Sequence, residues 1–256
     1  MFFIYPSMRV EIPSHTPILE RYKNREMLYR VLYCIAMGGY STRGDIAIAL
    51  EMDMSNTETK AVSLRKVARA CDTLAYEKMI QQEYGKFWWM SLYRLRLTPA
   101  GEKYWKDTYG LSVEESDWDK LIRQHNGADY LEHSSAVLLF AYHARLRGWV
   151  ARIMPEEDEL GTQPDLEIEN EEWILYVEVE RKASRAWSKQ ERWCKQYELQ
   201  REIVVCLASN AGAENFYNRL QGTEYPYYRI TSLEHLTQTA YLPERKKTMW
   251  LFENIR

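Results

Sequence analysis

The sequence predicts a two-domain protein of the α+β or α/β class, and three observations support this prediction. Three helical patterns followed by a β-hairpin occupy residues 21–109. A helix, three strands, a helix and a further strand begin at residue 130 and predict a second domain that extends to residue 256. A polar, acidic stretch at residues 110–129 is expected to be a linker, and residues 1–20 an N-terminal extension. The 256 residues are enough for two modest domains.

The first domain begins with helices whose apolar residues recur at helical spacing. In the first helix, at residues 21–37, the apolar stripe consists of Leu28, Val31, Leu32 and Ile35. Gly38 ends this helix, and Ser41 or Thr42 is expected to cap a short second helix. Asn56 or Thr57 is expected to cap a third helix. The apolar face of that third helix is expected to comprise Val62, Val67, Ala70 and Leu74.

A β-hairpin is expected after the third helix. Two strand-like runs flank Tyr84, Gly85 and Lys86, which we expect to form the turn. The second run is followed by "LTPAG" at residues 97–101. Three helices, a hairpin and an L-T-x-x-G junction resemble a winged helix-turn-helix domain, and the resemblance covers residues 21–109.

The resemblance implies that the third helix enters the major groove of DNA. The polar face of this helix would then carry the DNA-binding residues Lys60, Ser63, Arg65, Lys66 and Arg69. Lys86 would lie at the tip of the wing. Lys and Arg outnumber Asp and Glu by about five between Thr57 and Lys106, whereas the whole chain has a net charge of −3. Two alternatives remain: a winged helix that binds proteins, and a basic helix face that is simply solvated.

The second domain is expected to contain a mixed sheet with helices on both faces. A helix at residues 130–148 precedes a strand at 149–156, and strands at 163–169 and 171–182 are joined by a turn at Asn170. A helix at residues 185–200 leads to a buried strand at 202–209. A helix, a strand and a last helix follow before residue 239.

The strand at residues 171–182 carries a group of charged side chains on one face. Residues two apart share a face of a strand, so Glu178, Glu180 and Lys182 line one side while the alternating valines face the core. Asp165 begins the neighbouring strand, beside Glu178 or Glu180 depending on the register. Carboxylates on adjacent strands provide oxygen ligands for Mg²⁺ or Mn²⁺, and a nearby lysine can orient water or stabilise charge on phosphate. These are the groups that metal-assisted hydrolysis of a phosphodiester needs.

Pro164-Asp165, followed after about a dozen residues by Glu180-Arg181-Lys182, resembles the PD-(D/E)XK nuclease superfamily. The resemblance implies a restriction-endonuclease-like α-β-β-β-α-β core and an active site on its second and third strands. It implies that Asp165 and Glu180 hold the metal and that Lys182 assists catalysis, with Glu178 as a rival second carboxylate. By the same resemblance, Glu132 is an additional metal ligand. Gln190 or Lys195 on the following helix would reach the phosphate.

A closer likeness is to the replication-relaxation family of plasmids and mobile elements, which joins a winged helix to a nuclease-like core. It is carried by these segments: Leu131-Glu132-His133, Pro164-Asp165, Glu178-Val179-Glu180-Arg181, and the helix with Lys189, Lys195 and Tyr197. The spacing between lysine and tyrosine departs from the family pattern. The likeness implies processing of plasmid or mobile-element DNA, as an endonuclease or nickase.

Several alternatives stay open from the sequence. Glu178, Glu180 and Lys182 are equally compatible with a solvated strand face that carries internal ion pairs. The nuclease-like core can also serve a non-catalytic DNA-binding regulator or accessory protein, or a protein-interaction module. A homodimer, or a protein partner in a mobile-element or replication complex, is compatible with each.

Other classes of site have little support. The four cysteines are far apart, with no C-x-x-C, and indicate reduced thiols rather than a disulfide framework or zinc site. The five histidines form no metal-binding pair; His133 is expected to be a hydrogen-bonded polar group on a helix flank. No signal peptide or membrane span is expected, so the predicted location is the cytoplasm.

Overall fold

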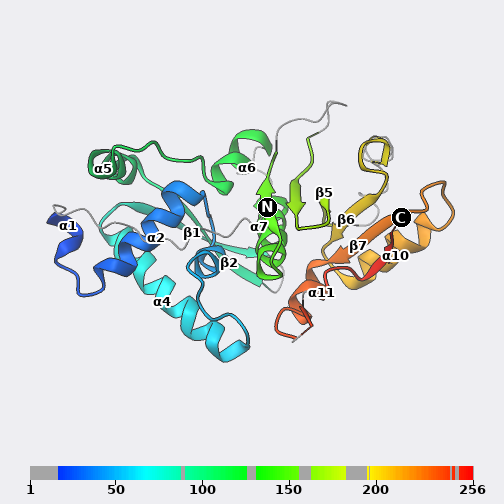
Figure 1. The fold of residues 1–256 in the computed structure, drawn as a ribbon, viewed down its shortest axis with the longest axis horizontal. Helices are drawn as coiled ribbons and strands as arrows, with labels where there is room; N and C mark the ends of the chain where they lie inside the picture. The colour runs from blue at the N-terminus through cyan, green and yellow to red at the C-terminus, as the bar shows by residue number, and fades with distance from the viewer. Residues whose placement is uncertain are drawn as a thin grey trace. The chain divides into compact units, whose positions relative to one another are not determined.

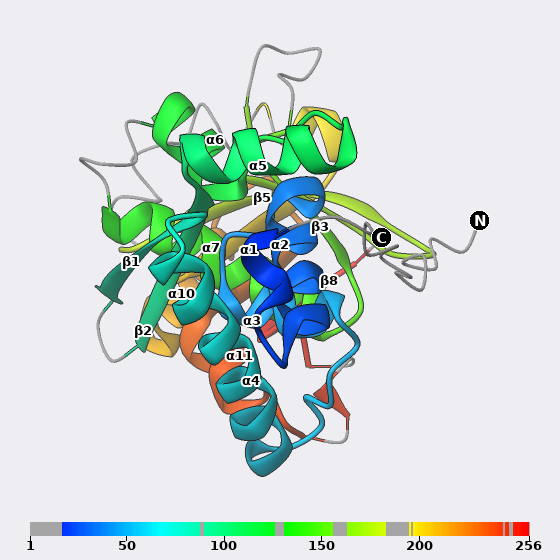
Figure 2. The same cartoon turned by 90° about the vertical axis from the view of Figure 1, so that its left-hand side faces the viewer.

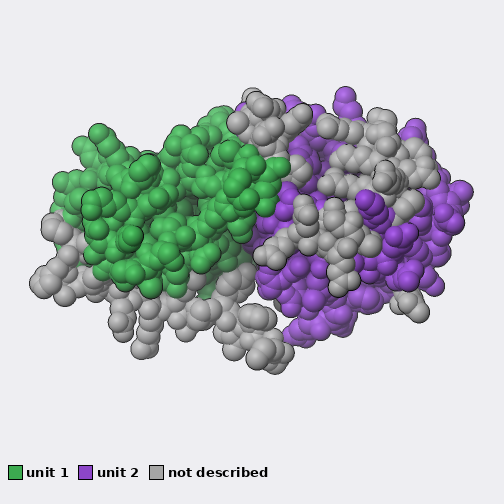
Figure 3. Space-filling model, turned by 90° about the horizontal axis from the view of Figure 1, so that it is seen from above, with its two compact units in different colours: residues 1–126 green, residues 127–256 purple. Residues whose placement is uncertain are grey.

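The computed structural model of this chain belongs to the α+β class and contains a mixed β-sheet (Figure 1). It describes residues 17–87, 90–125, 131–155, 163–182, 195, 197–242, 244–245 and 248–255. The chain divides into two compact units, Met1–Asn126 and Gly127–Arg256, which Figure 3 distinguishes by colour. Below, they are called unit 1 and unit 2.

Unit 1 begins with helices α1 (Pro17–Glu20), α2 (Arg25–Gly38), α3 (Arg43–Ala49) and α4 (Thr57–Tyr76). The structure resolves both ambiguous caps. The Thr42 side chain accepts a hydrogen bond from the Asp45 N–H and caps α3. Asn56 caps α4 in a reciprocal capping box with Thr59. Each cap satisfies backbone N–H groups that have no partner within the helix.

The expected apolar face of α4 is only partly correct. Val67, Ala70 and Leu74 are fully buried, but Val62 is 49% exposed. Val62 precedes Val67 by five residues, which places it well off the axis of that stripe in a helix with 3.6 residues per turn.

The hairpin of unit 1 pairs β1 (Ile80–Phe87) with β2 (Met90–Leu97) in antiparallel register. The turn expected at Tyr84-Gly85-Lys86 is wrong, because the ladder continues through these residues to the pair Phe87 and Met90. The connection at residues 88–89 lies outside the described residues. Thr42 forms an isolated bridge with Arg94 and adds a short third segment to this sheet.

The segment expected as a linker is folded onto unit 1 for much of its length. After α5 (Pro99–Tyr109), the chain enters α6 (Asp117–His125), which falls within residues 110–129. Trp118 on α6 is buried, and its backbone N–H donates a hydrogen bond to the Ser41 hydroxyl. The guanidinium carbon of Arg94 lies 4.4 Å from the centroid of the Trp118 ring. The Trp118 side chain therefore anchors to unit 1 a stretch whose polar composition predicts exposure to solvent.

Unit 2 begins with α7 (Leu131–Leu146) and strands β3 (Val150–Ile153), β4 (Leu166–Glu169) and β5 (Ile174–Glu180). Next come β6 (Ile203–Leu207), α10 (Asn210–Leu220), β7 (Tyr228–Ser232), α11 (Leu233–Gln238) and β8 (Phe252–Asn254). The helix expected at residues 185–200 is described only in part, at residue 195 and residues 197–200.

The six strands lie in sequence order, β3-β4-β5-β6-β7-β8. Strands β3, β4 and β5 are antiparallel, β5, β6 and β7 are parallel, and β8 returns antiparallel. α7 packs against β3, β4 and β5, while α10 packs against β6 and β7. The sheet is therefore mixed, and β5 occupies an interior position in it.

The described cysteines Cys34, Cys71 and Cys206 are buried thiols without a disulfide. Burial raises the pKa of Cys34 and Cys71 to about 12, and that of Cys206 well above its usual range. These thiols stay protonated near neutral pH and are poor nucleophiles. Among the described helices, none has the length and apolarity needed to cross a bilayer.

Gly101 should be essential for the stability of unit 1. A Cβ at this position would lie 1.9 Å from the Met79 carbonyl oxygen, so the backbone of α5 or of the β1 entry must shift. We expect Gly101→Ala to lower the free energy of unfolding by about 1–3 kcal/mol, measured by urea denaturation of the full chain. Glu102→Gln, at the exposed neighbouring position, should change it by less than about 0.5 kcal/mol. Equal stability of both variants would contradict this packing.

Candidate functional site

Strand β5 places two carboxylates in the interior of unit 2. Glu178 and Glu180 are each 3% exposed, and Val177 and Val179 on the opposite face are buried as well. The alternative of a solvated strand face is therefore wrong for these two glutamates. The reason is tertiary: β5 lies between β4 and β6, so neither of its edges nor its two faces opens to solvent near the glutamates.

The glutamates face the same side of the sheet as α10. In the parallel register, Glu178 pairs with Val205 and Glu180 with Leu207. Val205 and Leu207 belong to the apolar cluster that includes Phe216 of α10. Paired residues of neighbouring strands project to the same face, so two acidic groups lie next to an apolar layer.

Asp165 is fully buried and connects three parts of unit 2. Its Oδ2 accepts a hydrogen bond of 2.8 Å from the Val179 N–H of β5. Its Oδ1 lies 3.2 Å from Nε2 of His133 on α7. Its backbone carbonyl accepts the Met154 N–H at the end of β3. Because Leu166 pairs with Val177, Asp165 lies level with Glu178, which resolves the register that the sequence left open.

The first turn of α7 contributes an acid and a histidine to this region. The Glu132 carboxylate, expected as an additional metal ligand, forms an ion pair with the Arg181 guanidinium, and its side chain is 54% exposed. His133, which the sequence predicted to be a hydrogen-bonded polar group, contacts Asp165. The sequence draws attention to His133 through the segment Leu131-Glu132-His133. It does not reveal the contact with Asp165, because the two residues are 32 positions apart.

The remaining expected residues are not shown to contact these acids within the part of the chain that the structure describes. Lys182 is exposed and follows the end of β5 by two residues. Lys195 is half-buried, and Tyr197 packs against the α10 cluster with its ring 5.2 Å from that of Tyr225. Lys189 and Gln190 lie outside the described residues. The backbone register thus places Asp165 level with Glu178, and Lys182 is exposed to solvent.

Among the described residues, no group of three or more His, Cys, Asp or Glu side chains is arranged to hold a metal ion. The buried donors available near the ends of β4 and β5 are carboxylate oxygens, which suit hard cations such as Mg²⁺ and Mn²⁺. Mg²⁺ commonly uses one or two protein carboxylates and completes its coordination with water and substrate phosphate. A site based on Asp165 and Glu178 would have this composition.

The expected DNA-binding residues on α4 divide into two groups. Arg65, Lys66 and Arg69 are exposed and Lys60 is half-buried. Ser63 is buried, and its hydroxyl donates a 2.8 Å hydrogen bond to the Asp53 carbonyl, so its expected role as a DNA contact is wrong. Its position one turn from the buried Val67 places it on the inner side of the helix. The Lys86 side chain lies outside the described residues.

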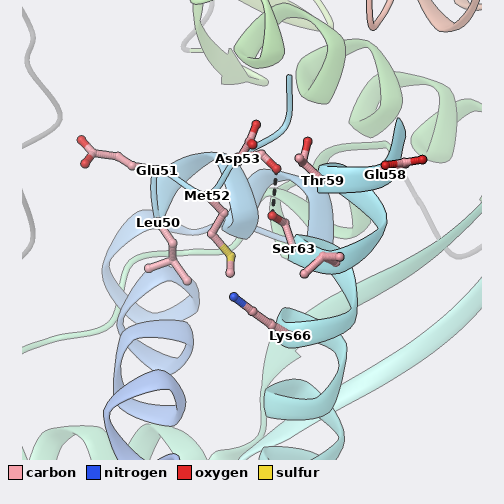
Figure 4. A pocket seen from close by; sticks show the side chains of 9 residues that line it. Leu50, Glu51, Met52, Asp53, Glu58, Thr59, Ser63 and Lys66 are labelled. Carbon is pink, nitrogen blue, oxygen red and sulfur yellow. Dashed lines mark hydrogen bonds between the residues drawn. The ribbon is translucent and has the colours of Figure 1, made fainter. Parts of the chain in front are cut away.

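A pocket of about 560 Å³ lies beside the first half of α4 (Figure 4). Three acidic residues, Glu51, Asp53 and Glu58, line it together with apolar side chains, and Lys66 points into it. The lining of this pocket therefore holds three acids and one lysine, and neither Arg65 nor Arg69 belongs to it. Phosphate groups would be attracted to the later turns rather than to the first.

Comparison of this chain with models of protein families, with curated proteins and with solved structures found no significant match.

Replacing Asp165 separates its structural role from its charge. Asp165→Ala leaves the buried Val179 N–H without its acceptor, so we expect a loss of about 1–3 kcal/mol in the free energy of unfolding. Asp165→Asn keeps an acceptor oxygen and should lose less. Urea denaturation and the exchange rate of the Val179 amide measure both effects. Glu171→Ala, in the exposed turn, is the control, and an equal loss in all three variants would contradict this role.

Proposed function

We propose that this protein is a metal-dependent DNA endonuclease or nickase of a plasmid or mobile element. In this proposal, unit 2 is a PD-(D/E)XK-like core of the replication-relaxation type, and unit 1 is a winged helix that holds the DNA. The observation that carries the proposal is the burial of Asp165, directly before β4, and of Glu178 and Glu180 on the adjacent strand β5. The succession of one helix, three antiparallel strands and a parallel strand supports the same core.

Buried carboxylates need an energetic explanation. Removing an ionised carboxylate from water costs several kcal/mol unless hydrogen bonds or opposite charge compensate. The Val179 N–H and His133 compensate Asp165 in part. Glu178 and Glu180 are buried next to the apolar α10 cluster. A divalent cation bound by these acids would compensate their negative charge further.

The donor set is compatible with Mg²⁺ or Mn²⁺, held by Asp165 and Glu178 or Glu180. When bound, such a cation polarises the phosphate and makes its bound water more acidic. The hydrogen bonds of Asp165 fix its carboxylate at the end of β4, so it is oriented in advance. Lys182, at the solvent boundary, is placed to stabilise charge on a phosphate that approaches from outside.

Three features of unit 1 support a winged helix. Helices α2, α3 and α4 precede the β1–β2 hairpin, and the Thr42–Arg94 bridge adds a third sheet segment. Helix α4 presents Arg65 and Arg69 to solvent. Exposed arginines on one helix provide the electrostatic attraction that phosphates require.

A second candidate function is a non-catalytic DNA-binding regulator or accessory protein. One observation favours it: Asp165 already makes hydrogen bonds with β5 and α7 that have a structural purpose. A nuclease-like core that no longer cuts DNA would retain such bonds. The two functions differ in whether metal-dependent cleavage occurs.

A cleavage assay on supercoiled plasmid and single-stranded DNA tests the proposal. With Mg²⁺ or Mn²⁺, we expect the wild-type protein to nick or linearise DNA. Asp165→Asn and Glu178→Gln should each reduce the rate by at least about 100-fold, because each removes a charged ligand. Glu172→Gln, exposed in the β4–β5 turn, is the matched control and should cut normally. Binding of DNA without metal-dependent cleavage would support the regulator instead.

Affinity for duplex DNA should depend on the later turns of α4. We expect Arg69→Ala to weaken binding and to reduce the slope of log K against log salt by about one, because one phosphate contact is lost. Ser63→Ala should leave both quantities unchanged, since Ser63 is buried. Fluorescence anisotropy from about 50 to 200 mM salt measures this. An unchanged slope in Arg69→Ala would exclude α4 as the phosphate-binding helix.

A further inference from the structure

The β1–β2 hairpin carries an exposed pair of tyrosines on one face. Tyr84 and Tyr93 are direct partners in the antiparallel register, with ring centroids 5.3 Å apart and an interplanar angle of 59°. Tyr84 is 55% exposed and Tyr93 is 37% exposed. Two aromatic rings that contact each other and remain exposed provide a surface on which a further planar group can stack.

Arg43 holds this pair in place. Its guanidinium carbon lies 3.7 Å from the centroid of the Tyr93 ring. The same guanidinium donates to Asp72 Oδ1 at 3.0 Å and to Gln82 Oε1 at 2.6 Å. Arg43 is therefore fixed by α4 and β1 and covers one side of Tyr93. Tyr84, the more exposed ring, offers the surface for a ligand.

The charges around the pair favour a nucleic acid over an apolar peptide. Gln82 Nε2 donates to Asp72 Oδ1, so this face of the hairpin lies beside α4 (Figure 2). Arg69 is exposed on α4 one turn before Asp72, and Arg65 one turn before that. Asp72, the acid at the centre, is neutralised by Arg43. Aromatic faces beside exposed arginines suit bases that are joined by phosphates.

We propose that Tyr84, Tyr93 and Arg43 form a stacking platform for an unpaired nucleotide of DNA, with Arg65 and Arg69 facing its phosphates. The partner is a single-stranded segment adjoining a duplex, because in a duplex the base faces are already covered by their neighbours. This inference rests on the proposed DNA-binding function of unit 1. It narrows the substrate to DNA with a junction between paired and unpaired strands.

Binding in EDTA tests the platform independently of cleavage. Two probes share one duplex: one is blunt, and the other carries a short thymine overhang containing 2-aminopurine. We expect tighter binding of the overhang probe by wild type, with quenching of 2-aminopurine fluorescence by stacking. Tyr84→Ala should weaken binding of the overhang about five- to 150-fold and abolish quenching, while binding of the blunt duplex stays unchanged. Tyr84→Phe should retain stacking, and Tyr76→Ala, an exposed tyrosine on α4, is the matched control.

The outcomes separate this inference from the proposed function. Equal binding of both probes by wild type would overturn the platform while leaving duplex binding by unit 1 intact. An equal loss for both probes in Tyr84→Ala would also overturn it, because the hairpin would then contact paired DNA. Failure to bind either probe would overturn the DNA-binding function itself. Circular dichroism of each variant verifies that the hairpin is folded.

Discussion

The hydrogen bonds of the buried Asp165 are the interactions on which the arrangement of unit 2 depends. Its carboxylate accepts a hydrogen bond from the Val179 N–H of β5 and contacts His133 of α7. Its backbone carbonyl accepts a hydrogen bond from the N–H of Met154, directly after β3. Three strands and a helix thus meet at one buried acid. Hydrogen bonds that orient an acid in the absence of a ligand are the kind of pre-organisation that a metal ligand needs.

The burial of the two glutamates of β5 bears on function as well as on stability. The residues of β6 that pair with these two positions, Val205 and Leu207, are apolar. Glu178 and Glu180 are acidic and yet are each only 3% exposed. Local choices that conflict with good packing concentrate at functional sites. Glu178 lies level with Asp165, and Glu180 precedes the exposed Lys182 by two residues. The proposed hydrolysis would take place here.

In unit 1, acidic and basic side chains occupy different parts of helix α4 and its surroundings. The start of α4 borders a pocket lined by Glu51, Asp53 and Glu58, whereas its later turns carry Arg65 and Arg69. The hairpin lies beside α4 and presents Tyr84 and Tyr93. In the proposed complex with DNA, phosphates would be disfavoured beside these three acids. In the same complex, the exposed arginines would contact phosphates and the tyrosine pair would hold an unpaired base.

The sequence by itself determined the order of most helices and strands, the caps at Thr42 and Asn56 to within one residue, and the alternation that puts Glu178 and Glu180 on one face of a strand. These features depend on local periodicity and capping, which neighbouring residues encode. Tertiary structure alone decided that this face is buried, that Asp165 lies level with Glu178, that Ser63 and Trp118 point inward, and that Tyr84 and Lys86 lie within a strand. Each of these depends on which distant segment packs alongside, as when β6 covers the second edge of β5. Burial and register arise from contacts between residues far apart in the chain, and no local pattern records them.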